Sequence, residues 1–442
     1  DVNEEKIKLW NSSNFEELPV YEPGLTEIIK RRRNKNLTFS SDIEKNISKA
    51  DLIFISVNTP TKKKGIGAGK ASDLKWIEVC ARQVALYSKG HTIIVEKSTL
   101  PVRTAEAIKE ILKSAQNKSN LKNYASTFDV LSNPEFLSEG SAINDLENPD
   151  RVLIGGENEN AMNALCEIYM NWVPKERILK TNIWSSELAK LTANAFLAQR
   201  VSSINSISAI CEETGADVRE VSRAIGLDSR IGPKFLDSGP GFGGSCFKKD
   251  ILNLVYLSEY FGLPEVAQFW NEVVKINQWH QKRISKLITK KLFGTLSGKK
   301  IGILGFAFKS DTNDTRESAA IQICKDLLEE GAILYINDPK VSSNQIAKDL
   351  NKKSFLLEVG EVNPSNTGEG SWKSTSDFNE IFSTSDAIVI LTEWKEFSEI
   401  NWETASKKMR RPGWVFDTRS IVNPDKVKDA GLNLWRIGDG LN

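Results

Sequence analysis

The stretch Ala50-Asp51-Leu52-Ile53-Phe54-Ile55-Ser56 decides the fold, because the chain repeats it as Ser385-Asp386-Ala387-Ile388-Val389-Ile390-Leu391. Both runs are apolar without alternation, which is typical of strands buried on both faces of a parallel sheet that helices cover. Each is followed by a further apolar run, Ile93 to Thr99 in the first half and Trp414 to Arg419 in the last third. We therefore predict an α/β fold with two doubly wound, Rossmann-like sheets, each with its ligand crevice at the carboxyl ends of the strands.

The last third of the chain also carries the opening part of such a sheet. Ile301 to Gly305 predicts a strand that enters a tight turn, Glu317 to Glu330 predicts a helix, and Ile333 to Asp338 predicts a second strand. That second strand ends in an acid. The repeat makes Asp51 equivalent to Asp386, and Asp1 lies about as far before Asp51 as Asp338 lies before Asp386. We therefore take Asp1 as the counterpart of Asp338.

This register has a consequence for the N-terminal half. Asp1 to Asn3 is predicted to be the tail of strand two, entering a helix from Glu4 to about Trp10. We then expect the first strand, its glycine turn and the first helix to be absent from the chain as written. In a Rossmann unit that turn grips a pyrophosphate, and the acid after strand two binds ribose hydroxyls. A disordered first residue, left by processing, is an equally good interpretation of Asp1.

The middle of the chain predicts helices and no strands. Trp184 to Cys211 contains neither proline nor glycine and repeats apolar residues at helical spacing, so it should form one long helix. Three more helices are predicted at Asp217 to Ile225, Phe247 to Phe261 and Glu265 to Phe293. An all-helical segment between two sheets commonly supplies the floor of a cleft and an oligomer contact. The predicted domains are a first sheet domain, a central helical domain and a second sheet domain, at 1–182, 183–292 and 293–442.

Composition excludes several classes of protein. The chain has 442 residues, of which 40% are hydrophobic and 26% charged, and its formal net charge is +1. A balanced charge argues against a nucleic-acid or membrane surface. No apolar run approaches the roughly 20 residues of a membrane span, and no basic-then-apolar leader opens the chain. We expect no nucleic-acid and no membrane partner.

Cysteine and histidine usage narrows the chemistry further. The five cysteines are scattered, odd in number and free of C-x-x-C pairs, which argues against a disulfide framework and for a reducing, cytoplasmic location. Only His91 and His280 supply imidazoles. Because no Cys/His/Asp cluster has ligand spacing, a metal is not expected, and a Ser-His triad has little to draw on.

The run Gly239-Pro240-Gly241-Phe242-Gly243-Gly244-Ser245-Cys246-Phe247-Lys248-Lys249-Asp250 is the strongest candidate for chemistry. Its glycines bring backbone amides close to any neighbouring ligand, and it delivers Cys246 to the start of a predicted helix. The helix dipole and two lysines there favour thiolate over thiol. Cys246 is therefore a candidate nucleophile; a glycine-rich turn with an incidental, core-type cysteine is the open alternative.

Lys190 and Asn194 are a second candidate pair. They lie four residues apart on the predicted long helix, so both side chains project from one face. A solvated polar pair on a helix surface is the alternative.

A family resemblance rests on several motifs taken together. The motifs are Asn58-Thr59-Pro60-Thr61, Glu96-Lys97-Ser98-Thr99, Asn133-Pro134-Glu135-Phe136-Leu137-Ser138-Glu139-Gly140, Asn148 to Gly156, the glycine-rich run with Cys246, Phe306-Ala307-Phe308-Lys309 and Asp314-Thr315-Arg316-Glu317-Ser318. In this order they closely resemble the eukaryotic UDP-glucose 6-dehydrogenases, which oxidise UDP-glucose to UDP-glucuronate with two NAD. The likeness covers essentially the whole chain; only the loop between Leu357 and Lys373 lacks a comparable signature.

The resemblance implies a covalent mechanism. A thiolate adds to the aldehyde to give a thiohemiacetal, and a second hydride transfer leaves a thioester that water hydrolyses. Hydrolysis needs a general base, and a cation with an amide donor would stabilise the oxyanion. The implied catalytic residues are Cys246 as nucleophile, Glu135 after the strand Asp129 to Ser132 as base, Lys190 and Asn194 at the oxyanion, Asp250 orienting water or Lys190, and Thr99 beside the bound water.

The same matches imply two binding sites. NAD contacts are implied for Asp1, Lys6, Val57, Asn58, Thr59, Pro60, Thr61, Ser98, Glu139, Lys249 and Arg316. Sugar-nucleotide contacts are implied for Phe136, Leu137, Ser138, Lys190, Asn194, Arg230, Phe242, Gly243, Phe308, Lys309 and Arg419. The turn Gly305 to Lys309 lacks the three glycines of a dinucleotide fingerprint, so a mononucleotide, the UDP moiety, is the better ligand for the second sheet. Lys309 and Arg419 would meet its diphosphate.

The sequence also fits two rival functions. A related enzyme could act on GDP-mannose or an N-acetylated UDP-hexosamine, although relatives of the latter type tend to carry a histidine where this chain has Ser245. A catalytically silent UDP-sugar-binding subunit is the other alternative, since the NAD glycine loop is expected to be absent and the activity of the chain as written is expected to be low. A homo-oligomer built on dimers, with a hexamer as one form, is expected.

Overall fold

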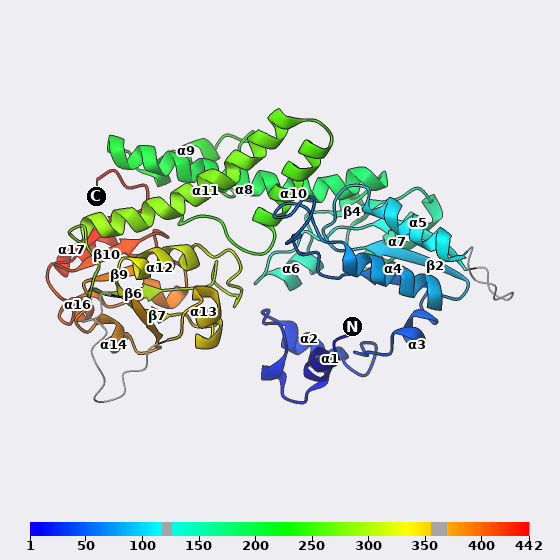
Figure 1. Cartoon of the computed structure of the whole chain (residues 1–442), viewed down its shortest axis with the longest axis horizontal. Helices are drawn as coiled ribbons and strands as arrows, with labels where there is room; N and C mark the ends of the chain where they lie inside the picture. The colour runs from blue at the N-terminus through cyan, green and yellow to red at the C-terminus, as the bar shows by residue number, and fades with distance from the viewer. Residues whose placement is uncertain (117–125, 355–368, 442) are drawn as a thin grey trace. The chain divides into compact units, whose positions relative to one another are not determined.

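A computed structural model describes residues 1–116, 126–354 and 369–441. The chain folds into two compact units (Figure 1). The first unit contains residues 1–194 and 249–268, and the second contains residues 195–248 and 269–442. Three long helices contribute residues to both units: α8 (Ile183–Thr214), α10 (Phe247–Tyr260) and α11 (Pro264–Lys291). The predicted helices of the middle segment are thereby confirmed, and the three predicted domain limits stay a prediction.

Over the residues that the structure describes, the sheet of the first unit has five strands in chain order. They are β1 (Leu52–Ile55), β2 (His91–Glu96), β3 (Thr127–Ser132), β4 (Val152–Gly155) and β5 (Ile178–Thr181). Neighbours run parallel except β3 and β4, which meet antiparallel through Ser132 and Gly155. The connection between these two strands contains one six-residue helix, α6 (Ala142–Glu147). At about 1.5 Å per residue this helix is too short to recross a sheet, so the chain returns against β3.

Helices cover both faces of this sheet. Ile94 and Val130 pack under α4 (Lys75–Tyr87) and α5 (Thr104–Gln116), whereas their chain neighbours Val95 and Leu131 pack against α7 (Glu159–Tyr169). Successive strand residues point to opposite faces, so both must be apolar when both faces are covered. This confirms the prediction drawn from the uninterrupted apolar runs. Among the described residues β1 forms one edge of the sheet, where Phe54 is 43% exposed.

The N-terminal segment is helical. It contains α1 (Glu4–Asn11), the 3-10 turn Phe15–Glu17, α2 (Leu25–Arg32) and α3 (Ile43–Ile47). The prediction of a strand tail at the first three residues was wrong. The Asn3 side chain accepts the Lys6 N–H and caps α1, Asp1 Oδ1 accepts the Asn3 N–H, and the Asp1 amino group donates to the Ser40 carbonyl at 3.2 Å. None of these three residues belongs to a strand.

The second unit holds a six-stranded parallel sheet. Its order is β11-β10-β9-β6-β7-β8, with β6 (Lys300–Leu304), β7 (Ile333–Asn337), β8 (Ser371–Ser374), β9 (Ala387–Ile390), β10 (Trp414–Asp417) and β11 (Asn433–Arg436). Leu52 pairs with Ile93 in the first sheet, and Ala387 pairs with Trp414 in the second. These are the positions that the internal repeat made equivalent, so the repeat is confirmed. In the second sheet β6 and β7 continue the sheet on the side of β9 that faces away from β10.

Shorter helices lie around the second sheet (Figure 1): α12 (Ala319–Glu329), α13 (Ser343–Leu350), α14 (Phe378–Phe382), α15 (Lys395–Ser398), α16 (Trp402–Ser406) and α17 (Pro424–Asp429). The helix α9 (Val218–Gly226) packs against α8 instead. The core includes the fully buried Phe306, Phe416 and Trp372. Trp372 belongs to β8 and to the segment between Leu357 and Lys373 that lacks a family signature; residues 357–368 of that segment lie outside the described residues.

No helix in the described parts of the chain is both long enough and apolar enough to cross a membrane. All five cysteines lie in described segments, and none of them forms a disulfide.

Candidate active site

Glu135 and Lys190 lie together in the first unit. The loop after β3 carries Glu135, whose Oε1 is 3.5 Å from the Lys190 Nζ. The other oxygen, Oε2, accepts the backbone N–H of Leu137 at 2.7 Å. The Lys190 ammonium also lies 5.3 Å from the centre of the Phe136 ring. The Glu135 carboxylate, a candidate general base, is thus in contact with the Lys190 ammonium, which could stabilise an oxyanion.

Asn194 continues this arrangement one helical turn along α8. Its Nδ2 donates to Asp250 Oδ2 at 2.6 Å, and Lys249 Nζ lies 3.8 Å from Asp250 Oδ1. Burial raises the pKa of Asp250, and the nearby Lys249 charge and the Asn194 hydrogen bond oppose that rise. Lys190 and Asn194 are only 4% and 6% exposed, so the alternative of a solvated surface pair is wrong.

The carboxyl ends of β1 and β2 are joined by side chains of the predicted NAD set. Thr59 Oγ1 donates to the Thr99 carbonyl at 3.1 Å, and Ser98 Oγ donates to the Val57 carbonyl at 2.7 Å. Lys249 Nζ lies 3.4 Å from Thr59 Oγ1. The loops after β1 and β2 are thus joined by hydrogen bonds and lie beside the Lys249 ammonium. Such loops at the carboxyl ends of parallel strands fit a cofactor that carries a pyrophosphate.

Other predicted NAD residues are more dispersed. Asp1 and Lys6 flank the start of α1, and Glu139 lies beside Gly140, whose N–H donates to Glu22 Oε2 at 2.8 Å. Arg316 belongs to the second unit, where it pairs with Asp314 at 2.6 Å. The roles proposed for Asn58, Pro60 and Thr61 after β1, and for Leu137 and Ser138 after β3, stay predictions.

In the second unit the glycine-rich run is held by side chains that we did not predict. Gly239 donates its N–H to Asn205 Oδ1 at 2.9 Å and accepts from His280 Nε2 at 2.9 Å. Asn277 makes two bonds to Phe242: its Oδ1 accepts the Phe242 N–H at 2.8 Å, and its Nδ2 donates to the Phe242 carbonyl at 3.1 Å. A sequence signal existed, since Asn277 and His280 lie three residues apart on α11, so their side chains share one face of that helix.

The backbone of this run requires glycine where it approaches its neighbours. At Gly241, with φ of +130°, a Cβ would lie 2.8 Å from Asn277 Oδ1, and at Gly243 it would lie 2.7 Å from the Glu317 carbonyl. Within this run Cys246 is half-buried, with the Ser245 hydroxyl 3.4 Å from its sulfur. The helix α10 begins at the next residue, as the helix-dipole argument for a thiolate requires.

The carboxyl edge of the second sheet gathers several predicted sugar-nucleotide residues. Arg419 donates from Nε to the Leu391 carbonyl and from one terminal nitrogen to the Phe308 carbonyl, both at 2.9 Å. The Phe308 ring lies against Gly244, 3.1 Å from where a Cβ would sit. Lys309 follows on the same turn. Arg230 is not brought to this group by any described contact; its side chain is 87% exposed and pairs with Asp228.

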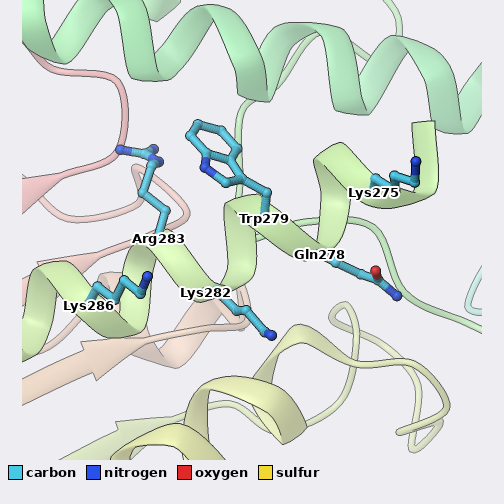
Figure 2. A pocket seen from close by; sticks show the side chains of 6 residues that line it. All are labelled: Lys275, Gln278, Trp279, Lys282, Arg283 and Lys286. Atoms are coloured by element: carbon cyan, nitrogen blue, oxygen red, sulfur yellow. The ribbon is translucent and has the colours of Figure 1, made fainter. Parts of the chain in front are cut away.

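A different cavity lies along α11 in the second unit. Its volume is about 400 Å³, and Figure 2 shows its lining side chains, which are Lys275, Gln278, Trp279, Lys282, Arg283 and Lys286. Arg283 is neutralised by Glu212 at 2.7 Å and Lys275 by Glu272 at 2.7 Å. All lining residues come from one helix and none is a predicted site residue, so this cavity is not the candidate active site. Within the described residues no group of three His, Cys, Asp or Glu side chains is placed to hold a metal.

Known proteins resemble the whole chain. It is 50% identical to UDP-glucose 6-dehydrogenase 1 of Glycine max, covering 100% of this chain and 91% of the relative. It is 52% identical to UDP-glucose 6-dehydrogenase of Pongo abelii, covering 99% of this chain and 87% of that protein. The solved structure of a UDP-glucose dehydrogenase from the hyperthermophilic archaeon Pyrobaculum islandicum superposes with a TM-score of 0.80 at 28% identity, over 98% of this chain and 90% of that one.

Three domain models of one family match successive parts of the chain. Described as the NAD binding, central and UDP binding domains of the UDP-glucose/GDP-mannose dehydrogenase family, they match residues 1–173, 184–279 and 302–424. These matches, the high identity over the full chain and the two Rossmann-like sheets agree. The chain therefore belongs to the UDP-glucose/GDP-mannose dehydrogenase family.

Proposed function

We propose that this protein is an NAD-dependent UDP-glucose 6-dehydrogenase, which oxidises UDP-glucose to UDP-glucuronate. The observation that carries the proposal is the buried polar cluster in the first unit, where Lys190 lies against Glu135 and Asn194 binds Asp250. Buried charged groups are costly unless they are used or well compensated, and such clusters gather at sites of chemistry. The relatives of the whole chain carry the same activity in their names.

The reaction passes through two covalent intermediates on Cys246, a thiohemiacetal and a thioester. The C6 alcohol loses a hydride and a proton to become an aldehyde, and the Cys246 thiolate then adds to its carbonyl carbon. The resulting thiohemiacetal loses its hydroxyl proton and a second hydride to become a thioester. Water attacks this carbonyl, Glu135 takes the proton of the water, and the thiolate of Cys246 leaves as the acid forms. NAD supplies the hydride acceptor in both oxidations.

The protein's residues supply charge and orientation for these steps. Lys190 and Asn194 donate toward the oxyanion that develops on the reacting oxygen, and Asp250 holds the Asn194 amide in place through a 2.6 Å hydrogen bond. Thr99 lies on the loop after β2, and its carbonyl accepts a hydrogen bond from Thr59. In the second unit, Arg419 and Lys309 would hold the diphosphate, and the backbone around Gly243 would meet the sugar.

A dimer-based homo-oligomer is the second part of the proposal. Phe196 of α8 and Phe269 of α11 are 55% and 56% exposed. Both rings contact Trp270, with centroid distances of 5.6 and 5.0 Å, so they form one aromatic surface. Apolar patches of this kind on a folded unit usually mark an interface. Light scattering of Phe196→Ser should give a smaller particle than the wild type; an unchanged mass contradicts this assignment.

The activity is tested by following NADH and the sugar together in the full-length protein. We expect two NADH per UDP-glucuronate formed, and mass spectrometry should find a substrate adduct on Cys246 during turnover. Cys246→Ser should abolish acid formation while UDP-glucose binding is kept. Faster turnover of GDP-mannose or an N-acetylated UDP-hexosamine, or UDP-glucose binding without NADH, would replace the proposal by one of its rivals.

A further inference from the structure

Lys97 is a half-buried cation to which the proposed mechanism gives no role. It follows β2 directly, and its Nζ donates to Asn133 Oδ1 and to the Tyr169 hydroxyl, both at 2.9 Å. Asn133 is 0% exposed and Tyr169, at the end of α7, is 5% exposed. The ammonium is thus directly bonded to two neutral acceptors inside the first unit.

The three side chains form a closed network. The Tyr169 hydroxyl donates to Asn133 Oδ1 at 2.6 Å, so this one oxygen accepts from both Lys97 and Tyr169. The other end of the Asn133 amide donates to the Leu153 carbonyl of β4 at 2.8 Å. The orientation of the amide is therefore determined by three partners. Because Asn133 lies two residues before Glu135, this network fixes the start of the loop that carries Glu135.

The charges that face Lys97 are those of the candidate site. Burial lowers the pKa of Lys97 to about 8; the Glu135 carboxylate opposes this shift and the Lys190 charge adds to it. Burial also raises the pKa of Tyr169 to about 12, so the phenol stays neutral. Burying an ammonium costs several kcal/mol, and neutral acceptors alone repay this poorly. An apolar side chain would fill the position at lower cost, so a charge kept here calls for a role in the site.

We propose that Lys97 is a positioning residue for Glu135: through Asn133 and Tyr169 its ammonium holds the Asn133-Pro134-Glu135 loop in place, and it adds a second positive charge beside the carboxylate. This inference rests on the proposed function, and it concerns the hydrolytic step alone. Lys97 acts through Asn133, so it affects the placement of the base and leaves hydride transfer and substrate binding nearly unchanged. A misplacement of about 1 Å can cost roughly 100-fold in rate.

The test follows decay of the Cys246 adduct by rapid quench and intact-protein mass spectrometry. In Lys97→Met we expect hydrolysis to slow by about 10- to 100-fold and the adduct to accumulate, with the UDP-glucose dissociation constant, measured without NAD, changed less than about threefold. The same substitution at Lys180, an exposed lysine of β5 that pairs with Glu159, is the matched control and should behave as the wild type. Adduct decay in Lys97→Met at the wild-type rate overturns the inference.

The pH profile separates a positioning charge from a merely structural lysine. Lys97 loses its charge as the pH rises through about 8, so the wild-type rate of adduct decay should fall on that alkaline side. Lys97→Arg stays charged over this range and should move the fall upward by about one pH unit or more, since the guanidinium does not titrate there. Identical alkaline limbs in the wild type and in Lys97→Arg contradict the assignment.

Two further readouts make every outcome informative. Tyr169→Phe removes one partner of the ammonium while keeping the ring, and it should slow adduct decay in the same direction as Lys97→Met; an unchanged rate counts against the network. If Lys97→Met does not fold, the Arg and Phe variants decide. If the wild-type protein forms neither NADH nor adduct, both the proposed function and this inference are contradicted. If the wild type turns over normally and the variants are unaffected, only this inference is contradicted.

Discussion

Replacing Asn277 tests how the glycine-rich run is held. The amide satisfies both the N–H and the carbonyl of Phe242, and Asn277 is itself 6% exposed, so Asn277→Ala leaves two backbone groups without their partner. Each unsatisfied buried group costs about 1–3 kcal/mol, so the unfolding free energy of the second unit should fall by about 2–6 kcal/mol. For a folded body of 150–250 residues each kcal/mol corresponds to roughly 2–4 °C, so the melting temperature should drop by about 4–24 °C.

Asn277→Asp sharpens this test, because an ionised carboxylate can still accept the Phe242 N–H but repels the Phe242 carbonyl. Burial and that carbonyl raise the pKa of the introduced acid above its unfolded value of about 4. The protonated acid can donate, so the variant should be most stable at low pH and lose stability as the pH rises through the folded pKa. Urea unfolding between pH 5 and pH 8 measures this, relative to the wild type.

A chemical readout tests whether the hydrogen bonds from Asn277 to Phe242 also affect Cys246. Alkylation by iodoacetamide, followed peptide by peptide, should change several-fold at Cys246 in Asn277→Ala, whereas the half-buried Cys80 of the first unit serves as the internal reference. Gln278→Ala removes the exposed neighbouring amide on the same helix and is the control (Figure 2). The reasoning is refuted if Asn277→Ala unfolds within about 0.5 kcal/mol of the wild type, the scatter expected of surface substitutions.

Three other outcomes are expected. His280, buried and with its pKa lowered to about 3, contributes stability that is fully present above its unfolded pKa of about 6.5 and is lost as the pH falls toward 3. At pH 5 the loss should reach about 2 kcal/mol in urea unfolding, and His280→Gln, which keeps a donor for the Gly239 carbonyl, should remove it; equal pH dependence speaks against this. Glu135→Gln should accumulate the Cys246 adduct in a single-turnover mass measurement, because acylation proceeds while water activation fails; normal turnover excludes Glu135 as the base. Lys249→Met should weaken NAD binding about tenfold by calorimetry, as expected for loss of one cation near a pyrophosphate; unchanged affinity removes Lys249 from the cofactor site.

The polar networks depended on tertiary contacts that no local pattern indicates. The Lys97 ammonium meets Asn133 36 residues away and Tyr169 72 residues away. Lys97 and Asn133 both lie in motifs that resemble the family, yet only the pairing of β2 with β3, which sets Glu96 opposite Ser132, shows that they touch. The packing of α7 onto the sheet adds Tyr169. The same holds for Asn277 and Phe242, 35 residues apart. Spacing along a helix predicts which side chains share a face; it does not tell what that face meets.

By itself, the sequence determined the two sheets, their internal repeat and the long helices between them. The physical reason is that strands covered on both faces must be apolar at every position, as at Ile94 and Val95, and that such runs end where turns begin. Glycines also marked the run before Cys246, since no other residue fits Gly241 or Gly243. Only the tertiary structure decided that β4 runs back against β3, because α6 is too short to recross the sheet. It also decided that Lys190 and Asn194 are buried, because burial depends on what the other elements place over a helix face.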